Sequence, residues 1–157
     1  MKILNIIITF MLSFCLLSGC STADKPSAEE VAYELKALTS NSINWSELDN
    51  NKMSTYFQLE NSEVENFKGY INSAEERFDM IAVFSFSDQK AKKSVLEAVE
   101  ATTRDMSENY KLANGNEATK ISNRLLAETD DLVILCIIDQ NDSLKKYLTD
   151  NIGVKLL

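Results

Sequence analysis

The chain has 157 residues, 45% of them apolar, which suits a single globular domain and is too apolar for a disordered chain. It has no histidine, so the commonest general base and the commonest transition-metal ligand are both missing. All 24 acidic residues and 15 of the 16 basic residues lie after Cys20. The chain after Cys20 therefore has a net charge of −9. Such a surface repels nucleic acid and anionic lipid headgroups, so we expect no nucleic-acid binding.

The first 19 residues have the pattern of a secretory signal peptide. Lys2 supplies the positive start, and residues 3–16 are apolar apart from three polar positions. The next stretch, Leu17-Ser18-Gly19-Cys20, resembles the lipobox of bacterial lipoproteins, in which the cysteine receives diacylglycerol and a signal peptidase cleaves before it. An uncleaved signal anchor is the alternative, but the run is short for a membrane span and lacks basic residues at its far end.

Residues 20–27 form a short polar tether in this interpretation, and residues 28–157 form one domain. Two acyl chains on Cys20 hold a protein on a membrane essentially permanently. About six residues reach at most roughly 20 Å. We therefore expect an extracytoplasmic domain close to the outer face of the cytoplasmic membrane, attached through the lipid on Cys20.

The first half of the domain has one clear helix. Ser27 and Glu30 have the spacing of a capping box, which predicts a helix over residues 28–38. Apolar residues between positions 53 and 59 follow no clear period, so we expect irregular structure or a short strand there. A brief helical turn is predicted after Ser62.

The second half alternates paired strands with helices. We predict strands over residues 69–71 and 79–86, a long helix over 88–112, strands over 124–128 and 132–138, and a helix over 142–151. The strands at 79–86 and 132–138 are apolar on both sides, which indicates central positions. The order predicts an α+β fold: an antiparallel sheet of about four strands, built from two hairpin-helix units, with helices packed on one face plus the N-terminal helix.

The whole pattern resembles a family of small Gram-positive lipoproteins known only as a domain of unknown function (domain of unknown function 4358). The resemblance covers residues 31–148 and depends on the order of elements. It includes Tyr56-Phe57-Gln58-Leu59, and Ala74-Glu75-Glu76 leading into Ile81-Ala82-Val83-Phe84. It implies no catalytic residue and no cofactor.

Two local patterns match known nucleophile chemistry, and each has a plainer structural explanation. Cys136 lies inside an apolar strand, where a thiol is normally buried with a raised pKa, and no histidine exists to activate it. Ser87 and Lys90 have the Ser-x-x-Lys spacing of some serine acyl-transfer enzymes. At a strand-to-helix junction, however, Ser and Asp residues ordinarily cap the helix.

A third pattern is reminiscent of a calcium loop. Four of its positions hold the oxygen-bearing residues Asp139, Asn141, Ser143 and Asp150. The sixth position needs glycine for the sharp turn, and it is Leu144. We therefore predict no metal site.

Two groups of residues are weak binding candidates. Trp45, Tyr56 and Phe57 could form a stacking platform for a sugar or peptide, although such aromatics more often pin a loop to the core. The carboxylates of Glu75, Glu76 and Asp79 could perform acid-base chemistry, although neighbouring acids in an acidic protein are usually solvated.

The sequence thus favours a non-enzymatic binding or interaction module for a protein or cell-envelope ligand. Two alternatives stay open: an envelope hydrolase using the carboxylates at positions 75, 76 and 79, and an assembly subunit of a membrane complex.

Overall fold

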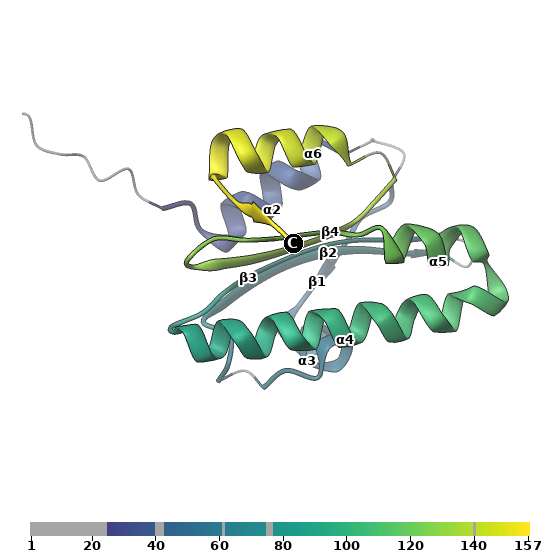
Figure 1. Cartoon of the computed structure of the whole chain (residues 1–157), viewed down its shortest axis with the longest axis horizontal. Helices are drawn as coiled ribbons and strands as arrows, with labels where there is room; N and C mark the ends of the chain where they lie inside the picture. Colours follow the sequence, from purple (N-terminus) through teal and green to yellow (C-terminus); the bar gives the residue numbers. More distant parts are fainter. Residues whose placement is uncertain (1–24, 40–42, 61, 75–76, 140) are drawn as a thin grey trace, which may run out of the picture.

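A computed structural model of the chain describes residues 25–39, 43–60, 62–74, 77–139 and 141–157. Cys20 and the signal peptide lie outside these residues. The described part contains one six-stranded sheet of order β1-β2-β3-β5-β4-β6, in which every neighbouring pair is antiparallel. Helices cover both faces of this sheet (Figure 1), so the molecule has three layers.

The two central strands are β3 (Arg77–Ser85) and β5 (Leu132–Ile137), and Ile81 pairs with Cys136 between them. Successive side chains of a strand point to opposite faces, and both faces of these strands are buried. Met80 and Phe84 belong to the core on one face, whereas Ile81 belongs to the core on the other. The predicted central positions are confirmed.

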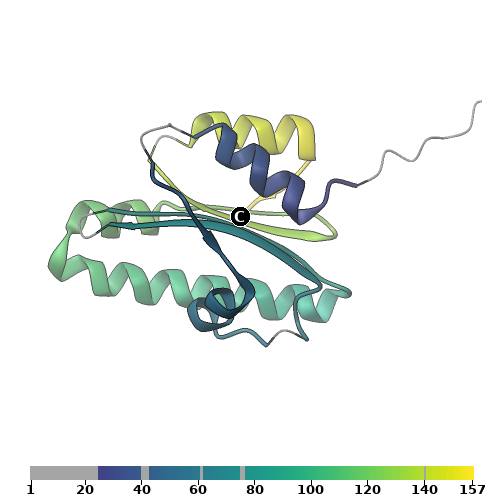
Figure 2. The ribbon, with the colours of Figure 1, turned by 180° about the vertical axis from the view of Figure 1, so that it is seen from behind.

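One face is covered by α2 (Ala28–Ala37), α6 (Asp142–Tyr147) and the π-helical segment η2 (Leu148–Ile152). These elements lie together on the same side of the sheet in the view from behind (Figure 2). The predicted capping box opens α2: the backbone N–H of Glu30 donates to Ser27 Oγ at 3.2 Å, and the backbone N–H of Ser27 donates to the Glu30 carboxylate at 2.8 Å.

The opposite face is covered by α3 (Asn50–Phe57), α4 (Gln89–Ala113) and α5 (Gly115–Ser122). The carboxylate of Asp88 caps α4 by accepting from the backbone N–H groups of Lys90 and Ala91, at 2.9 and 2.8 Å. This is the predicted capping role of the Ser87–Lys90 segment. The buried stripe of α4, which includes Val95 and Val99, packs against β3 and β5.

The outer strands extend the sheet in both directions. β2 (Asn66–Ala74) pairs with β3 over its whole length, and β1 (Ser46–Leu48) pairs with β2. On the other side β4 (Leu125–Glu128) pairs with β5, and β6 (Lys155–Leu156) pairs with β4. Both predicted hairpins are present.

Two parts of the predicted fold are wrong. The sheet has six strands and not about four, because the short edge strands β1 and β6 carry too few residues to show an alternating pattern. The helices lie on both faces and not on one. The physical reason is that two central strands with apolar residues on both sides need both faces covered.

The segment between residues 50 and 68 also differs from the prediction. Residues 50–57 form a helix, in which Met53 and Phe57 are buried one turn apart. After Ser62 the chain makes a short turn, in which the backbone N–H of Glu63 donates to the carbonyl of Glu60 at 3.0 Å. The turn does not carry Phe67 as predicted, because Phe67 belongs to β2, opposite Phe84 of β3.

Candidate functional site

The three aromatic candidates do not form one platform. Trp45 is half-buried on the α2 face of the sheet, and its Nε1 donates to Thr39 Oγ1 at 3.0 Å. Phe57 is buried on the opposite face, edge-on to Phe84 with ring centroids 5.2 Å apart. Only Tyr56 and Phe57 share a surface, and Trp45 instead pins the residues before β1 to the core.

Asp79 lies in a buried charged cluster, where the sequence suggested a solvated acid. Its side chain is 0% exposed, and Glu75 and Glu76 lie outside the described residues. One carboxylate oxygen accepts from Arg77 Nε at 2.5 Å and Asn72 Nδ2 at 3.0 Å, and the other accepts from Lys120 Nζ at 3.1 Å. Both oxygens are therefore occupied, so the position of Asp79 gives a hydrolase no free base.

The same cluster joins α5 to the β2–β3 hairpin. Lys120 Nζ lies 2.8 Å from the Glu117 carboxylate, which also accepts from the backbone N–H of Phe78 at 2.7 Å. Burial alone would raise the pKa of Asp79, but its hydrogen bonds from Arg77, Asn72 and Lys120 outweigh that effect and hold the pKa below its ordinary value. These contacts hold α5 against the β2–β3 hairpin, which is a structural role.

The remaining sequence candidates have structural roles. Cys136 is fully buried in β5, and burial raises its pKa to about 12, so the thiol is inert at neutral pH as predicted. In the segment resembling a calcium loop, Asp142–Tyr147 is helical and Asp150 pairs with Lys146. Among the described residues, no group of three or more acidic or cysteine side chains is placed to hold a metal ion.

A first hollow of about 410 Å³ lies beside the β4–β5 turn. Its cations are engaged with its carboxylates: Lys25 with Asp131 at 2.5 Å, and Lys92 and Lys155 with Glu128 at 3.0 and 3.6 Å. The hydrogen bond from Lys92 is the main reason why the pKa of Glu128 is lowered. Because each of these ammonium groups already has a carboxylate partner, a ligand would have to break an ion pair to bind.

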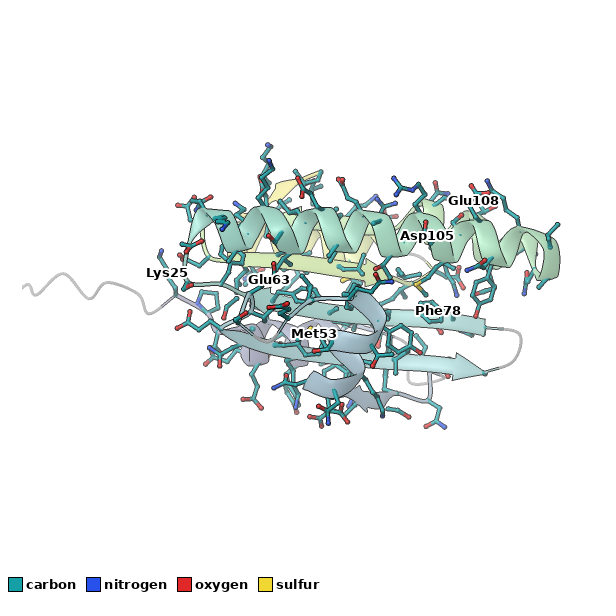
Figure 3. The ribbon with its side chains drawn as sticks, turned by 90° about the horizontal axis from the view of Figure 1, so that it is seen from below. Lys25, Met53, Glu63, Phe78, Asp105 and Glu108 are labelled. Carbon is teal, nitrogen blue, oxygen red and sulfur yellow. The ribbon has the colours of Figure 1, made fainter. Side chains whose placement is uncertain are left out.

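A second hollow of about 510 Å³ lies between α3 and α4, two helices of the same face (Figure 3), and we call it the α3–α4 groove. One wall is the end of α3 with the residue after it. The other wall is a single stripe of α4, in which positions three and four residues apart share a face. The groove is lined by Tyr56, Phe57, Gln58, Ala98, Ala101, Thr102, Asp105, Met106 and Asn109.

The two walls are fixed to each other. Thr102 Oγ1 on α4 donates to the backbone carbonyl of Tyr56 on α3 at 3.2 Å, and Phe57 is anchored in the core below. This hydrogen bond and the buried ring of Phe57 hold the last turn of α3 against α4. The shape of the α3–α4 groove is therefore preformed, as is usual for ligand sites.

Gln58 has a strained backbone at the rim of this groove. Its φ and ψ are 54° and 33°, and among the described residues it is the only non-glycine residue with a positive φ. Glycine is the usual residue at such a helix end, because a side chain in this conformation costs roughly 1–2 kcal/mol. Strained residues of this kind concentrate at functional sites.

Three polar side chains of the groove, those of Gln58, Asp105 and Asn109, contribute little to the fold. The amides of Gln58 and Asn109 have no hydrogen-bond partner in the described part of the chain, and Asp105 has only a contact of 3.8 Å with Arg104. Sequence reasoning did not find these three residues. Gln58 could not be found because α3 was not predicted, whereas the i, i+4 spacing of Asp105 and Asn109 was visible within the predicted long helix.

Comparison with known proteins identifies a family. The model of a family described as "Domain of unknown function (DUF4358)" matches residues 37–138. The matched part includes the whole α3–α4 groove and the buried charged cluster of Asp79, and it excludes Cys20 and α6. No curated protein and no solved structure matches the chain. In the part that the structure describes, none of the helices combines the length and the apolar character of a membrane span.

Proposed function

Since the chain belongs to the DUF4358 family, whose description states no activity, we propose its function from its own residues. The protein is a lipid-anchored extracytoplasmic lipoprotein, and its domain binds a ligand or partner in the α3–α4 groove without catalysing a reaction. The proposal has two parts, an anchor and a binding site, and each is tested separately.

The observation that carries the binding site is Gln58. Its strained backbone places an amide with no hydrogen-bond partner among the described residues at the rim of a groove whose volume, about 510 Å³, lies within the range of ligand sites. Glycine would end α3 in the same left-handed geometry without this cost, so a glutamine at this position is explained if its side chain serves a ligand. The first hollow lacks this feature, because its charges already neutralise one another.

The anchor is supported by the Leu17-Ser18-Gly19-Cys20 segment and by the short chain that joins it to the domain. Lys25, the first described residue, is already tied to Asp131 of the β4–β5 turn at 2.5 Å, only five positions after Cys20. Such a short link suits a domain that works next to the membrane.

The anchor is tested with Cys20→Ala expressed in a Gram-positive host and labelled with a radioactive or alkyne fatty acid. We expect the variant to lose all label and to accumulate as a larger precursor, since the modified thiol is missing. Cys136→Ser serves as the matched control and should be labelled and processed normally. Unchanged labelling of Cys20→Ala would exclude the anchor.

The binding site is tested by screening the full-length lipidated protein in nanodiscs against a panel of neutral sugars, short peptides and phosphoesters. We expect at least one class to bind and Gln58→Gly to weaken that binding. We also expect every probe to be recovered chemically unchanged. Turnover of a probe, with loss of that turnover on a single substitution, would contradict the non-enzymatic part of the proposal.

A further inference from the structure

We propose that the ligand of the α3–α4 groove is a neutral carbohydrate. The inference rests on the proposed function and names the ligand class for the same groove. The ring of Tyr56 would lie against the apolar face of a sugar, and the side chains of Gln58, Asp105 and Asn109 would bind its hydroxyl groups.

The polar groups of the groove have the chemistry that hydroxyl groups need. A sugar hydroxyl both donates and accepts, and a side-chain amide offers two donors and a carbonyl acceptor in one plane. Within the part of the chain that the structure describes, the amides of Gln58 and Asn109 have no hydrogen-bond partner, and Asp105 adds a carboxylate that only accepts. Each of these side chains can pair with neighbouring hydroxyls of one ring.

The placement of these groups leaves room for a ring between them. Asp105 and Asn109 are one turn apart on α4, so they lie on one face, while Gln58 comes from the opposite wall at the end of α3. Ala98 and Ala101 line the groove with the smallest side chains, which keeps it open beside Tyr56. A flat ligand with an apolar face and a polar rim matches this arrangement.

Charge argues against anionic ligands. The chain from Cys20 onward has a net charge of −9, and the groove itself contains Asp105 and no cationic side chain among its lining residues. Phosphorylated or carboxylated ligands would be repelled. An amphipathic helix as ligand would need a row of apolar pockets, whereas one wall of this groove carries Asp105 and Asn109 where such pockets would have to be.

The test measures binding of two matched sugars by calorimetry, with the lipidated protein in nanodiscs. The neutral probe is a β-1,4-linked trimer of glucose, and the anionic probe is the same trimer oxidised at C6 to glucuronic acid. We expect the neutral trimer to bind and the anionic trimer to bind at least about tenfold more weakly, because like charges repel.

Three variants locate the site. Gln58→Gly and Asn109→Ala should each weaken binding of the neutral trimer by about threefold to tenfold, the usual effect of one lost hydrogen bond. Asn116→Ala removes an equally exposed amide from helix α5 and should leave the affinity unchanged. Gln58→Gly should also melt at a higher temperature than the wild type, which separates lost binding from lost folding.

The outcomes separate this inference from the proposed function. Equal binding of the neutral trimer to the wild type and all three variants, or equal binding of both trimers, overturns the inference. A basic peptide of alternating lysine and alanine serves as the third probe. If only this peptide binds, and Gln58→Gly and Asn109→Ala weaken it, the carbohydrate is wrong and the groove is right. If no probe binds, both proposals fail.

Discussion

Gln58 is the residue where the chain departs furthest from ordinary backbone preferences. Replacing it with glycine removes the steric cost of a positive φ, so we expect Gln58→Gly to raise the free energy of unfolding by about 1 kcal/mol. Urea denaturation of the two proteins measures this difference. Gly153→Ala is the control in the opposite direction. It places a side chain where φ is 71°, so we expect this substitution to lower the free energy of unfolding. A Gln58→Gly variant less stable than the wild type would mean that the side chain supports the fold.

Asp79 makes stability depend on pH. Because its folded pKa is below its ordinary value, it stabilises the fold fully above the pKa of the unfolded carboxyl, about 3.9. This stabilisation is lost as the pH falls from there through the folded pKa. We expect Asp79→Asn to lower the free energy of unfolding by about 3 kcal/mol at pH 7, since Lys120 loses a buried partner.

The check for Asp79 is denaturation at pH 7, 5 and 3. The wild type should lose stability toward pH 3 more steeply than the Asp79→Asn variant. Asp150→Asn, which removes an exposed carboxylate paired with Lys146, should change the slope less than Asp79→Asn does, because solvent screens an exposed ion pair. A variant that follows the wild-type curve would show that Asp79 does not titrate as described.

Some of these residue roles could be predicted from the sequence and others could not. The buried thiol of Cys136 and the capping role of Asp88 followed from their immediate neighbours in the chain. The burial of Asp79 did not, because its partner Lys120 lies 41 positions later and only the folded sheet brings the two together. Local pattern identifies caps and core positions, whereas buried ion pairs depend on topology.

The helices and central strands were predictable because their hydrophobic periods are long. α2, α4, β3 and β5 begin and end within two residues of the predicted limits. α3 was missed because eight residues contain only two buried positions, Met53 and Phe57, too few to establish a period. One wall of the α3–α4 groove is the end of α3. The site could therefore not be predicted from the sequence, although the fold class could.

Gly69 allows β2 to lie close to its neighbours. A Cβ at this position would come within 2.7 Å of Phe67 Cζ, 3.1 Å of the Ile81 carbonyl oxygen and 3.2 Å of Leu48 Cβ. We expect Gly69→Ala to lower the free energy of unfolding by about 1–3 kcal/mol through overpacking. Thermal and urea denaturation check this value.

Gly115→Ala is the matched control for Gly69→Ala. A Cβ at position 115 meets no atom within 4 Å, so this substitution at the start of α5 should leave stability unchanged or slightly higher. A similar loss in both variants would point to an effect common to glycine replacement and not to crowding beside β1.

At the scale of the whole molecule, the position of Lys25 predicts how an anchored domain sits on the membrane. Lys25 and Glu63 lie toward one end of the molecule, and Glu108 lies toward the other (Figure 3). We expect a fluorophore on Glu63→Cys to be quenched by headgroup-attached quenchers more strongly than one on Glu108→Cys. The buried Cys136 should not react, so each variant takes one label.

The same two labelled domains produced from residue 21 onward, without the signal peptide and Cys20, are the control, and without an anchor both should escape quenching. Equal quenching of the two lipidated proteins would show that the tether does not orient the domain. The sequence predicted a domain close to the bilayer, but the end that faces it could be inferred only from the fold.

The two edges of the sheet determine how readily neighbouring molecules could pair through their strands. β1 has three residues and β6 has two, so the outermost strand at each edge offers few backbone groups for pairing with a strand of another molecule. Proteins confined to a surface meet one another at high local concentration, where long, flat edges lead to aggregation. With the proposed lipid anchor in place, these short edge strands would limit strand pairing between neighbours, so we expect the anchored domain to remain dispersed on a crowded membrane.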